Sequence, residues 1–310
     1  YEIGSGLVGS EMCIRDSAIS VPNIFMERMI GRENFTLFDP HEILAVKGYA
    51  LEDFYDTDDN KEFTKRYLEC EQDPNLHGIE VPALDMMKKI MRSAVETGTP
   101  FIFFRDTVNA ANPNKHAGMI YASNLCHEIA QNVGFTNLAE EIINEDGTIT
   151  TKTNTGDMVT CNLNSISLGR ITDEELEENI ALQIRMLDNV ISINQAPVPE
   201  SRMTSDKYRA IGLGTSGYHH YLVNHDIQWE SDEHIEVADK LFENIAYYAI
   251  KASMELAKEK GAYPAFKGSE WETGEYFTRR GYTSDRWKQL ASNVAKYGIR
   301  NGCLLYTSPS

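Results

Sequence analysis

Apolar positions recur along the chain with two different periods, one typical of helices and one typical of strands. Helices are predicted at 22–32, 82–97, 172–193, from about 216, and at 232–260. In 82–97 and 232–260 the apolar positions recur every three to four residues. Strands are predicted at 35–38, before a turn at Asp39–Pro40, and at 210–213, with a hairpin within 142–168. The compact apolar run 101–104 predicts a buried strand. Because strand-like runs recur between helices, the pattern predicts an α/β fold.

Glycine and capping residues mark several ends of these elements. Gly98 and Gly261 follow the apolar pattern of two helices directly, where a glycine commonly ends a helix. Thr172–Glu175 has the form of a capping box that opens a long helix. For the hairpin, either Asp146–Gly147 or Thr155–Gly156 can form the turn.

Composition and charge exclude two classes of partner. Of 310 residues, 42% are hydrophobic and 25% charged, which is typical of a soluble globular protein, and no apolar run approaches the length of a membrane span. The formal net charge is −18, so counterion release would not favour binding to a nucleic acid. Five cysteines without regular spacing do not form a disulfide framework, so we expect reduced thiols in the cytoplasm.

The two ends of the sequence are related through the DNA that can encode them. Residues 12–17 can be encoded by a DNA whose reverse complement, read one frame over, encodes residues 303–307. This relation is typical of translated sequencing adapter, which has to be set aside before the fold is considered. We therefore expect residues 1–17 and 303–310 to be non-native tails. Residues 18–302 would then be one domain cut short at both ends.

The stretch 121–129 holds the residues best suited to chemistry. In an extended backbone, side chains two residues apart share a face, so Asn124, Cys126 and Glu128 would point the same way. An amide, a thiol and a carboxylate would then supply a hydrogen-bonding group, a redox or radical centre and a base. The spacing alone also fits a strand with a buried cysteine beside polar surface residues. Cys126 and His127 form a poor nucleophile–base pair, since neighbours on a strand point to opposite faces.

The same stretch resembles a known family. Ser123 to Ile129, read as Ser-Asn-Leu-Cys-x-Glu-Ile, is similar to the finger loop of class I ribonucleotide reductase large subunits. Leu125 stands where the related cobalamin-dependent enzymes usually have proline. Further similar stretches follow in the family's order across residues 18–302: 101–106 with Asn109, 161–166, 209–214 and 297–301.

The resemblance implies a fold and a reaction. The fold would be part of a ten-stranded α/β barrel with the finger loop at its centre. The reaction would be the reduction of ribonucleoside diphosphates to 2′-deoxyribonucleoside diphosphates for DNA synthesis. Cys126 would become a thiyl radical that takes the 3′ hydrogen, Glu128 would accept the 3′-hydroxyl proton, and Asn124 would bind the sugar hydroxyls. Ser123 and Leu125 would complete the substrate site.

The resemblance also implies further participants. Cys161 would be one member of a redox-active disulfide, with its partner upstream of this chain. No cofactor would be bound directly: the radical would come from a metal-containing small subunit, and the electrons from a thioredoxin- or glutaredoxin-type donor. The large subunit would form a homodimer. Cys70 does not stand in a matching context, so we interpret it as structural. The stretch between Cys126 and Cys161 is longer than in some relatives, and the predicted hairpin accommodates it.

Three other features suggest different functions. Gly212–Gly217 satisfies G-x-G-x-x-G, so a dinucleotide-dependent oxidoreductase is one alternative, although a tight strand-to-helix turn explains the glycines better. His219, His220 and His225 have no carboxylate at ligand spacing, so no metal site is expected. A non-catalytic barrel homologue is a further alternative, and the presence of Asn124 to Glu128 argues against it.

Overall fold

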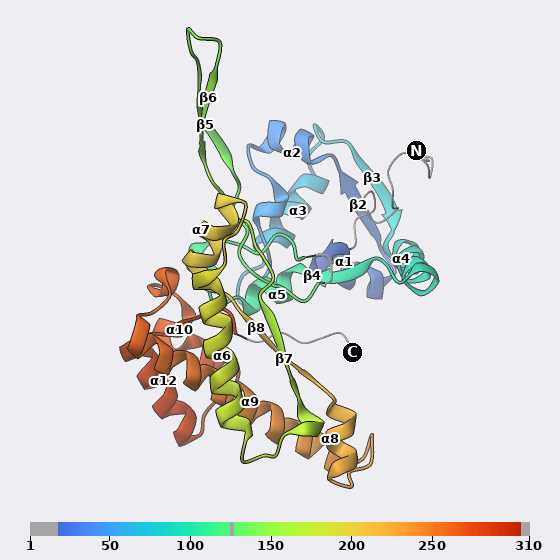
Figure 1. Cartoon of the computed structure of the whole chain (residues 1–310). Coiled ribbons are helices and arrows are strands. Elements are labelled where there is room, and N and C mark those ends of the chain that lie inside the picture. Colours follow the sequence, from blue (N-terminus) through green and yellow to red (C-terminus); the bar gives the residue numbers. More distant parts are fainter. Residues whose placement is uncertain (1–17, 125–126, 305–310) are drawn as a thin grey trace. The chain divides into compact units, whose positions relative to one another are not determined.

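The computed structural model describes residues 18–124 and 127–304, which fall into two compact units. The first unit holds residues 18–112 and 119–130, and the second holds 113–118 and 131–304. Figure 1 shows the helices and strands of both. The first unit contains β1 (Ala18–Val21), α1 (Asn23–Gly31), β2 (Asn34–Phe38), α2 (Pro40–Lys47), the 3₁₀ helix η2 (Leu51–Asp53), α3 (Glu62–Glu71), β3 (Gly78–Pro82), α4 (Ala83–Thr97), β4 (Phe101–Phe104) and α5 (Arg105–Ala111).

Two small sheets and the helices beside them build the first unit. β1 pairs with β4 in parallel and β2 pairs with β3 in antiparallel register. α1 packs on α4, where Phe25, Met87 and Ile90 form part of a buried apolar cluster. The predicted helix 82–97 is confirmed, and it ends at Gly98 with a φ of +78°, a conformation that glycine adopts without steric cost.

Two predictions for the first unit are wrong in detail. Asp39–Pro40 does not form an isolated turn but begins α2, because the Asp39 side chain accepts a hydrogen bond of 2.8 Å from the His41 amide. A proline in the first turn suits a helix as well as it suits a turn. The strand 101–104 is present, but it is not buried throughout: Phe103 is buried, whereas Phe101 and Phe104 are exposed. In the described part of the chain, β1 is the one strand beside it.

The second unit is mostly helical. Its elements are η3 (Lys115–Ala117), β5 (Asn137–Ile143), β6 (Ile149–Asn154), β7 (Leu163–Ser167), η4 (Leu168–Arg170), α6 (Leu176–Ile193), α7 (Pro199–Tyr208), β8 (Gly212–Ser216), α8 (Tyr218–Asn224), α9 (Asp232–Lys260), η5 (Pro264–Phe266), α10 (Glu270–Thr273), α11 (Glu275–Arg279) and α12 (Asp285–Tyr297).

The core of the second unit lies between α6 and α9. Ile180 and Ile184 of α6 and Ala249 and Ile250 of α9 are completely buried in one large apolar cluster. α9 has the bounds that the sequence predicts, 232–260. α6 ends at the predicted residue but begins at Leu176. The Thr172 amide does donate to the Glu175 carboxylate over 3.0 Å, as in a capping box, yet the helix starts only after it.

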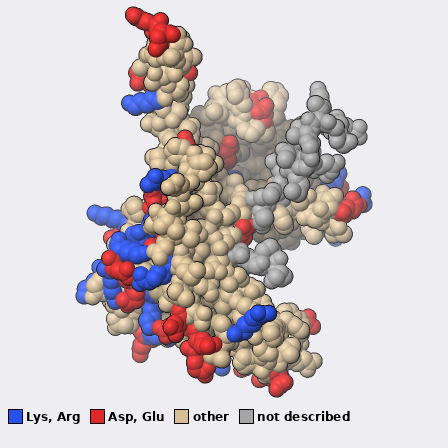
Figure 2. Space-filling model, viewed as in Figure 1, with Lys and Arg blue, Asp and Glu red and all other residues tan. Residues whose placement is uncertain are grey.

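The hairpin is present, but its bounds differ from the prediction. β5 and β6 form an antiparallel ribbon with its turn at Asp146–Gly147, one of the two predicted sites, and every residue of both strands is exposed. The ribbon extends beyond the end of α7 in its unit, and acidic side chains gather at its tip (Figures 1 and 2). Residues 163–167, predicted as part of this hairpin, instead form β7, which pairs in parallel with β8.

The α/β class is confirmed, but the barrel is not seen. In residues 18–124 and 127–304 the eight strands form four separate two-stranded sheets, and none of them closes into a barrel. No helix within these ranges is long and apolar enough to cross a membrane.

Of the two predicted non-native tails, the structure describes Cys303 and Leu304. Their carbonyls accept hydrogen bonds from the Ile211 and Leu213 amides at 3.0 and 2.9 Å, and Leu304 is buried. Backbone bonds of this kind do not depend on side-chain identity. The predicted domain boundaries therefore stay a prediction.

Candidate active site

The predicted finger loop belongs to the first unit, where α5 holds its beginning in place. Asn109 of α5 is buried, and its amide forms two hydrogen bonds to the backbone of Ile120, as donor to the carbonyl at 2.9 Å and as acceptor from the amide at 2.8 Å. A third bond, to the Arg105 carbonyl at 3.0 Å, fixes the Asn109 side chain on its own helix. These bonds satisfy both backbone groups of Ile120 in the interior.

Asp106, beside Asn109 on the same helix, ties other segments to α5. Its buried carboxylate accepts hydrogen bonds from the amides of Asn23 at 2.6 Å and Asp56 at 3.0 Å. Asp106 and Asn109 both belong to the residues that resemble the family, 101–106 with Asn109. The structure gives them a supporting role that the sequence alone did not indicate.

The described residues among 123–129 are hydrogen bonded to one another. The Asn124 side-chain oxygen accepts from the Ile129 amide at 3.0 Å, and the Ser123 hydroxyl donates to the Ile129 carbonyl at 2.5 Å. The Asn124 carbonyl accepts from the His127 amide at 3.1 Å, and His127 has a φ of +66°.

The left-handed conformation of His127 and the hydrogen bond from its amide to the Asn124 carbonyl favour a looped form of this segment over the extended form assumed for a shared face. That Asn124, Cys126 and Glu128 converge on one site stays a prediction. Asn124 and Glu128 are both partly buried within this loop. Leu125 and Cys126 lie outside the described residues.

Cys161 lies in the second unit, between β6 and β7, and is exposed. It borders a cavity of about 170 Å³ together with the side chains of Thr160, Asn162, Asn194, Arg202 and Ser205, among others. Cys161 therefore belongs to a different unit from Asn124, and the meeting of the two parts in one site stays a prediction.

The remaining described cysteine of interest, Cys70, is consistent with a structural residue. It is 1% exposed on α3, and its sulfur lies 3.8 Å from the Tyr49 hydroxyl. Burial raises the pKa of the Cys70 thiol, which disfavours the reactive thiolate.

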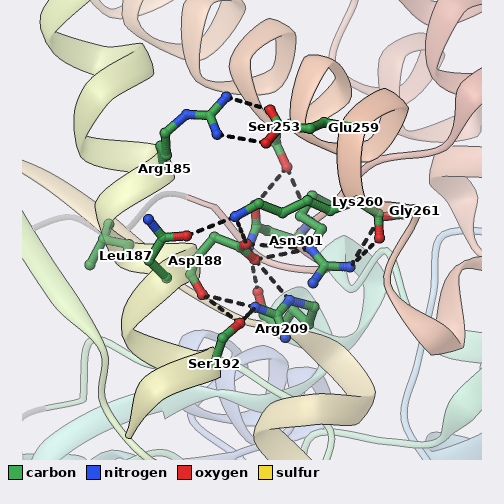
Figure 3. A network of polar contacts seen from close by, with 12 residues as sticks. Arg185, Leu187, Asp188, Ser192, Arg209, Ser253, Glu259, Lys260, Gly261 and Asn301 are labelled. Carbon is green, nitrogen blue, oxygen red and sulfur yellow. Dashed lines mark hydrogen bonds and ion pairs between the residues drawn. The ribbon is translucent and has the colours of Figure 1, made fainter.

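A polar network that the sequence analysis missed lies inside the second unit (Figure 3). Asp188 of α6 has no exposed surface, and its carboxylate accepts hydrogen bonds from Arg209 at 2.8 Å, Arg300 at 3.2 Å and Asn301 at 3.4 Å. The Lys260 ammonium lies 3.3 Å away. Burial raises the pKa of the Asp188 carboxyl, but the Arg209 hydrogen bond and the three positive charges outweigh it, so that the pKa is lowered.

The network joins three parts of the second unit that are distant in sequence. Arg300 also donates to the carbonyls of Lys260 and Gly261, at the C-terminal end of α9, where a cation is favoured. Asn301 donates to the Arg209 carbonyl at 2.9 Å and is hydrogen bonded to Ser253. The segment after α12 is thereby fixed against α6 and α9. The sequence does contain a sign of this network. Asp188 lies on the apolar face of α6, next to Leu187, and a buried charge is rare unless it is paired.

The alternative functions find no support in the fold. A dinucleotide site needs a strand–helix–strand unit. Gly212–Ser216 is a strand and α8 follows it, but in the described part of the chain every later element is helical. Among the described residues, no group of three or more His, Cys, Asp or Glu side chains is placed to hold a metal ion, and His219, His220 and His225 do not form one.

An α/β chain in whose sequence an amide, a thiol and a carboxylate stand close together has the fold class and the residue types of an enzyme domain. The model of the family described as ribonucleotide reductase, barrel domain, matches residues 14–310, and the chain belongs to this family.

Three relatives align with most of this chain, and each is named ribonucleoside-diphosphate reductase subunit alpha. The protein of Treponema pallidum is 48% identical over 303 residues, that of Helicobacter pylori strain J99 36% over 343 residues, and that of Synechocystis 34% over 305 residues. Each alignment covers 94% of this chain, but only 35%, 42% and 36% of the respective relative. The chain therefore spans between a third and a half of the length of these relatives.

Proposed function

We propose that the protein to which this chain belongs reduces ribonucleoside diphosphates to 2′-deoxyribonucleoside diphosphates by a cysteine thiyl-radical mechanism. The observation that carries the proposal is the family match over residues 14–310. It is supported by the names of the relatives and by the sequence segment that carries Asn124, Cys126 and Glu128.

The proposed roles follow the chemistry of the side chains. Cys126, as a thiyl radical, takes the hydrogen atom from C3′, so that an S–H bond forms as the C–H bond breaks. Glu128 accepts the proton of the 3′ hydroxyl, and Asn124 donates hydrogen bonds to the sugar through its amide nitrogen, since its oxygen is engaged by the Ile129 amide. Ser123 and Leu125 complete the substrate site.

Cys161 and a second cysteine supply the electrons in this proposal. Two thiols give two electrons and two protons, the 2′ oxygen leaves as water, and the sulfurs end joined as a disulfide. Exposure of Cys161 beside a cavity lined by hydroxyl and amide groups supports this role, because disulfide exchange requires an accessible sulfur.

We extend the proposal to the complete protein and its partners. The complete protein would form a ten-stranded barrel around the loop 123–129, act in the cytoplasm and pair with a second large subunit. A metal-containing small subunit would supply the radical, and a thioredoxin- or glutaredoxin-type protein would reduce the disulfide.

Replacing individual cysteines in the full-length protein tests this assignment. With a ribonucleoside diphosphate, the small subunit and a dithiol reductant, Cys126→Ser abolishes deoxynucleotide formation, because an alcohol does not replace the thiol as hydrogen-atom carrier. Cys161→Ser stops multiple turnover. Cys70→Ala is the matched control, since Cys70 is buried away from the loop residues, and it retains turnover. Wild-type rates in Cys126→Ser would refute the radical role.

A further inference from the structure

His127 occupies a backbone conformation that an ordinary packing residue does not favour. Its φ of +66° lies in the left-handed region, which is strained by roughly 1–2 kcal/mol for most residues with a side chain. It stands between Asn124 and Glu128 in the sequence, and both of these residues have proposed roles in catalysis.

Two hydrogen bonds join His127 to the Asn124 carbonyl. The backbone amide of His127 donates over 3.1 Å, and the ring nitrogen Nδ1 lies 3.0 Å from the same oxygen. A carbonyl oxygen can only accept, so Nδ1 must carry a proton. The His127 side chain thus acts as a second donor to the carbonyl that closes the turn.

The imidazole ring is held against two aromatic rings of β4. Its centroid lies 5.5 Å from that of Phe101 and 5.7 Å from that of Phe103. The Nε2 atom is buried and forms no hydrogen bond within residues 18–124 and 127–304. Burying an acceptor in this way costs about 1–3 kcal/mol. A phenyl ring would fill the same space without this cost, so packing does not account for an imidazole here, whereas the Nδ1 donor does.

We propose that His127 is a positioning residue that acts through Asn124. It fixes the Asn124 carbonyl, while the Ile129 amide fixes the side-chain oxygen of the same residue. With both oxygens held, the orientation of the Asn124 side-chain amide, and with it the directions of its two N–H donors, is fixed. The inference rests on the proposed function for its effect on catalysis, but the ordering of the loop does not depend on it.

Two substitutions in the full-length protein separate the hydrogen bond from the packing. His127→Phe keeps a ring beside Phe101 and Phe103 but loses the Nδ1 donor. His127→Asn loses the ring but keeps a side-chain donor and tolerates the left-handed conformation. If the donor positions Asn124, kcat falls about tenfold in His127→Phe, the factor expected for a hydrogen bond of ~1.4 kcal/mol, with KM for the nucleotide little changed. His127→Asn stays close to the wild type.

Hydrogen exchange of the Ile129 amide gives a readout that does not need activity. Exchange is faster in His127→Phe than in the wild type and in His127→Asn, at equal melting temperatures of the three proteins. Wild-type exchange and turnover in His127→Phe, or equal loss in both variants, overturns the inference. If the wild-type protein does not reduce ribonucleotides, the proposed function fails, while the exchange rates still test the role of His127.

Discussion

The carboxylate of Asp188 shows how much one buried charge can matter in this fold. It has no exposed surface and faces two guanidinium groups and an ammonium group. Removing one partner of a buried ion pair leaves the opposite charge buried and uncompensated, which typically costs roughly 3–5 kcal/mol. We therefore expect Asp188→Asn to lower the free energy of unfolding by about that amount, measured by urea denaturation.

Arg185 offers a matched control on the same helix. It pairs with Glu259 on the surface, where both side chains are about half exposed (Figure 3). Exposed pairs contribute roughly 0–1 kcal/mol, so Arg185→Ala should change stability little. Equal effects of the two substitutions would contradict the central role of Asp188.

The effect of Asp188 should also depend on pH in one direction. Its pKa is lowered in the folded protein, below the value of about 3.9 in an unfolded chain. Its contribution to stability is therefore complete above that value and is lost as the pH falls through the lower folded pKa. The stability difference between the wild type and Asp188→Asn should be constant from pH 7 to about pH 5 and shrink in stronger acid. A difference that grows on acidification would show that another group is responsible.

Single residues were predicted best where their chemistry is local. The capping role of Gly98 follows from the apolar pattern before it, and burial of Cys70 fits its interpretation as structural. The left-handed conformation of His127 and the bonds of Asn109 to Ile120 were not foreseen. Both depend on contacts between elements that the pattern of one element does not contain.

At the scale of elements, the long helices were predicted and the strand pairings were not. A helix such as α9 carries its own periodic signal over 29 residues, and its hydrogen bonds are local. β7 pairs with β8 across a gap that contains α6 and α7, so no local pattern indicates the partner. Residues 163–167 were placed in the hairpin for that reason.

The β5–β6 ribbon is an element that its unit should tolerate losing. All its residues are exposed, and an isolated two-stranded ribbon adds little stability in water. The ribbon can be removed by joining Asn137 to Asn154, its partner in the ladder, through a two-residue Asn-Gly turn. The melting temperature of this variant should stay within about 3 °C of the wild type, which corresponds to a change of less than about 1 kcal/mol in the free energy of unfolding. Circular dichroism on heating would test this. Loss of a cooperative transition would show that the ribbon stabilises the unit.

At the scale of the whole molecule, the residues proposed for catalysis come from both units. Asn124 and Glu128 belong to the first, and Cys161 belongs to the second. Local patterns in the sequence predicted the class α/β and the three longest helices, α4, α6 and α9. The barrel came from the resemblance alone, because closure of a sheet depends on pairings between distant strands.

The 310-residue chain by itself should fold without completing the reaction. It spans 35% of the relative from Treponema pallidum, and the proposed reduction needs a second cysteine that the resemblance places upstream. We expect the purified 310-residue chain, given a ribonucleoside diphosphate, a small subunit and a dithiol, to form no deoxynucleotide, whereas the full-length protein does. Cooperative unfolding of the same sample confirms that inactivity is not misfolding. Repeated turnover by the 310-residue chain would mean that Cys161 finds its redox partner within it, and the division of the site between this chain and the rest of the protein would have to be abandoned.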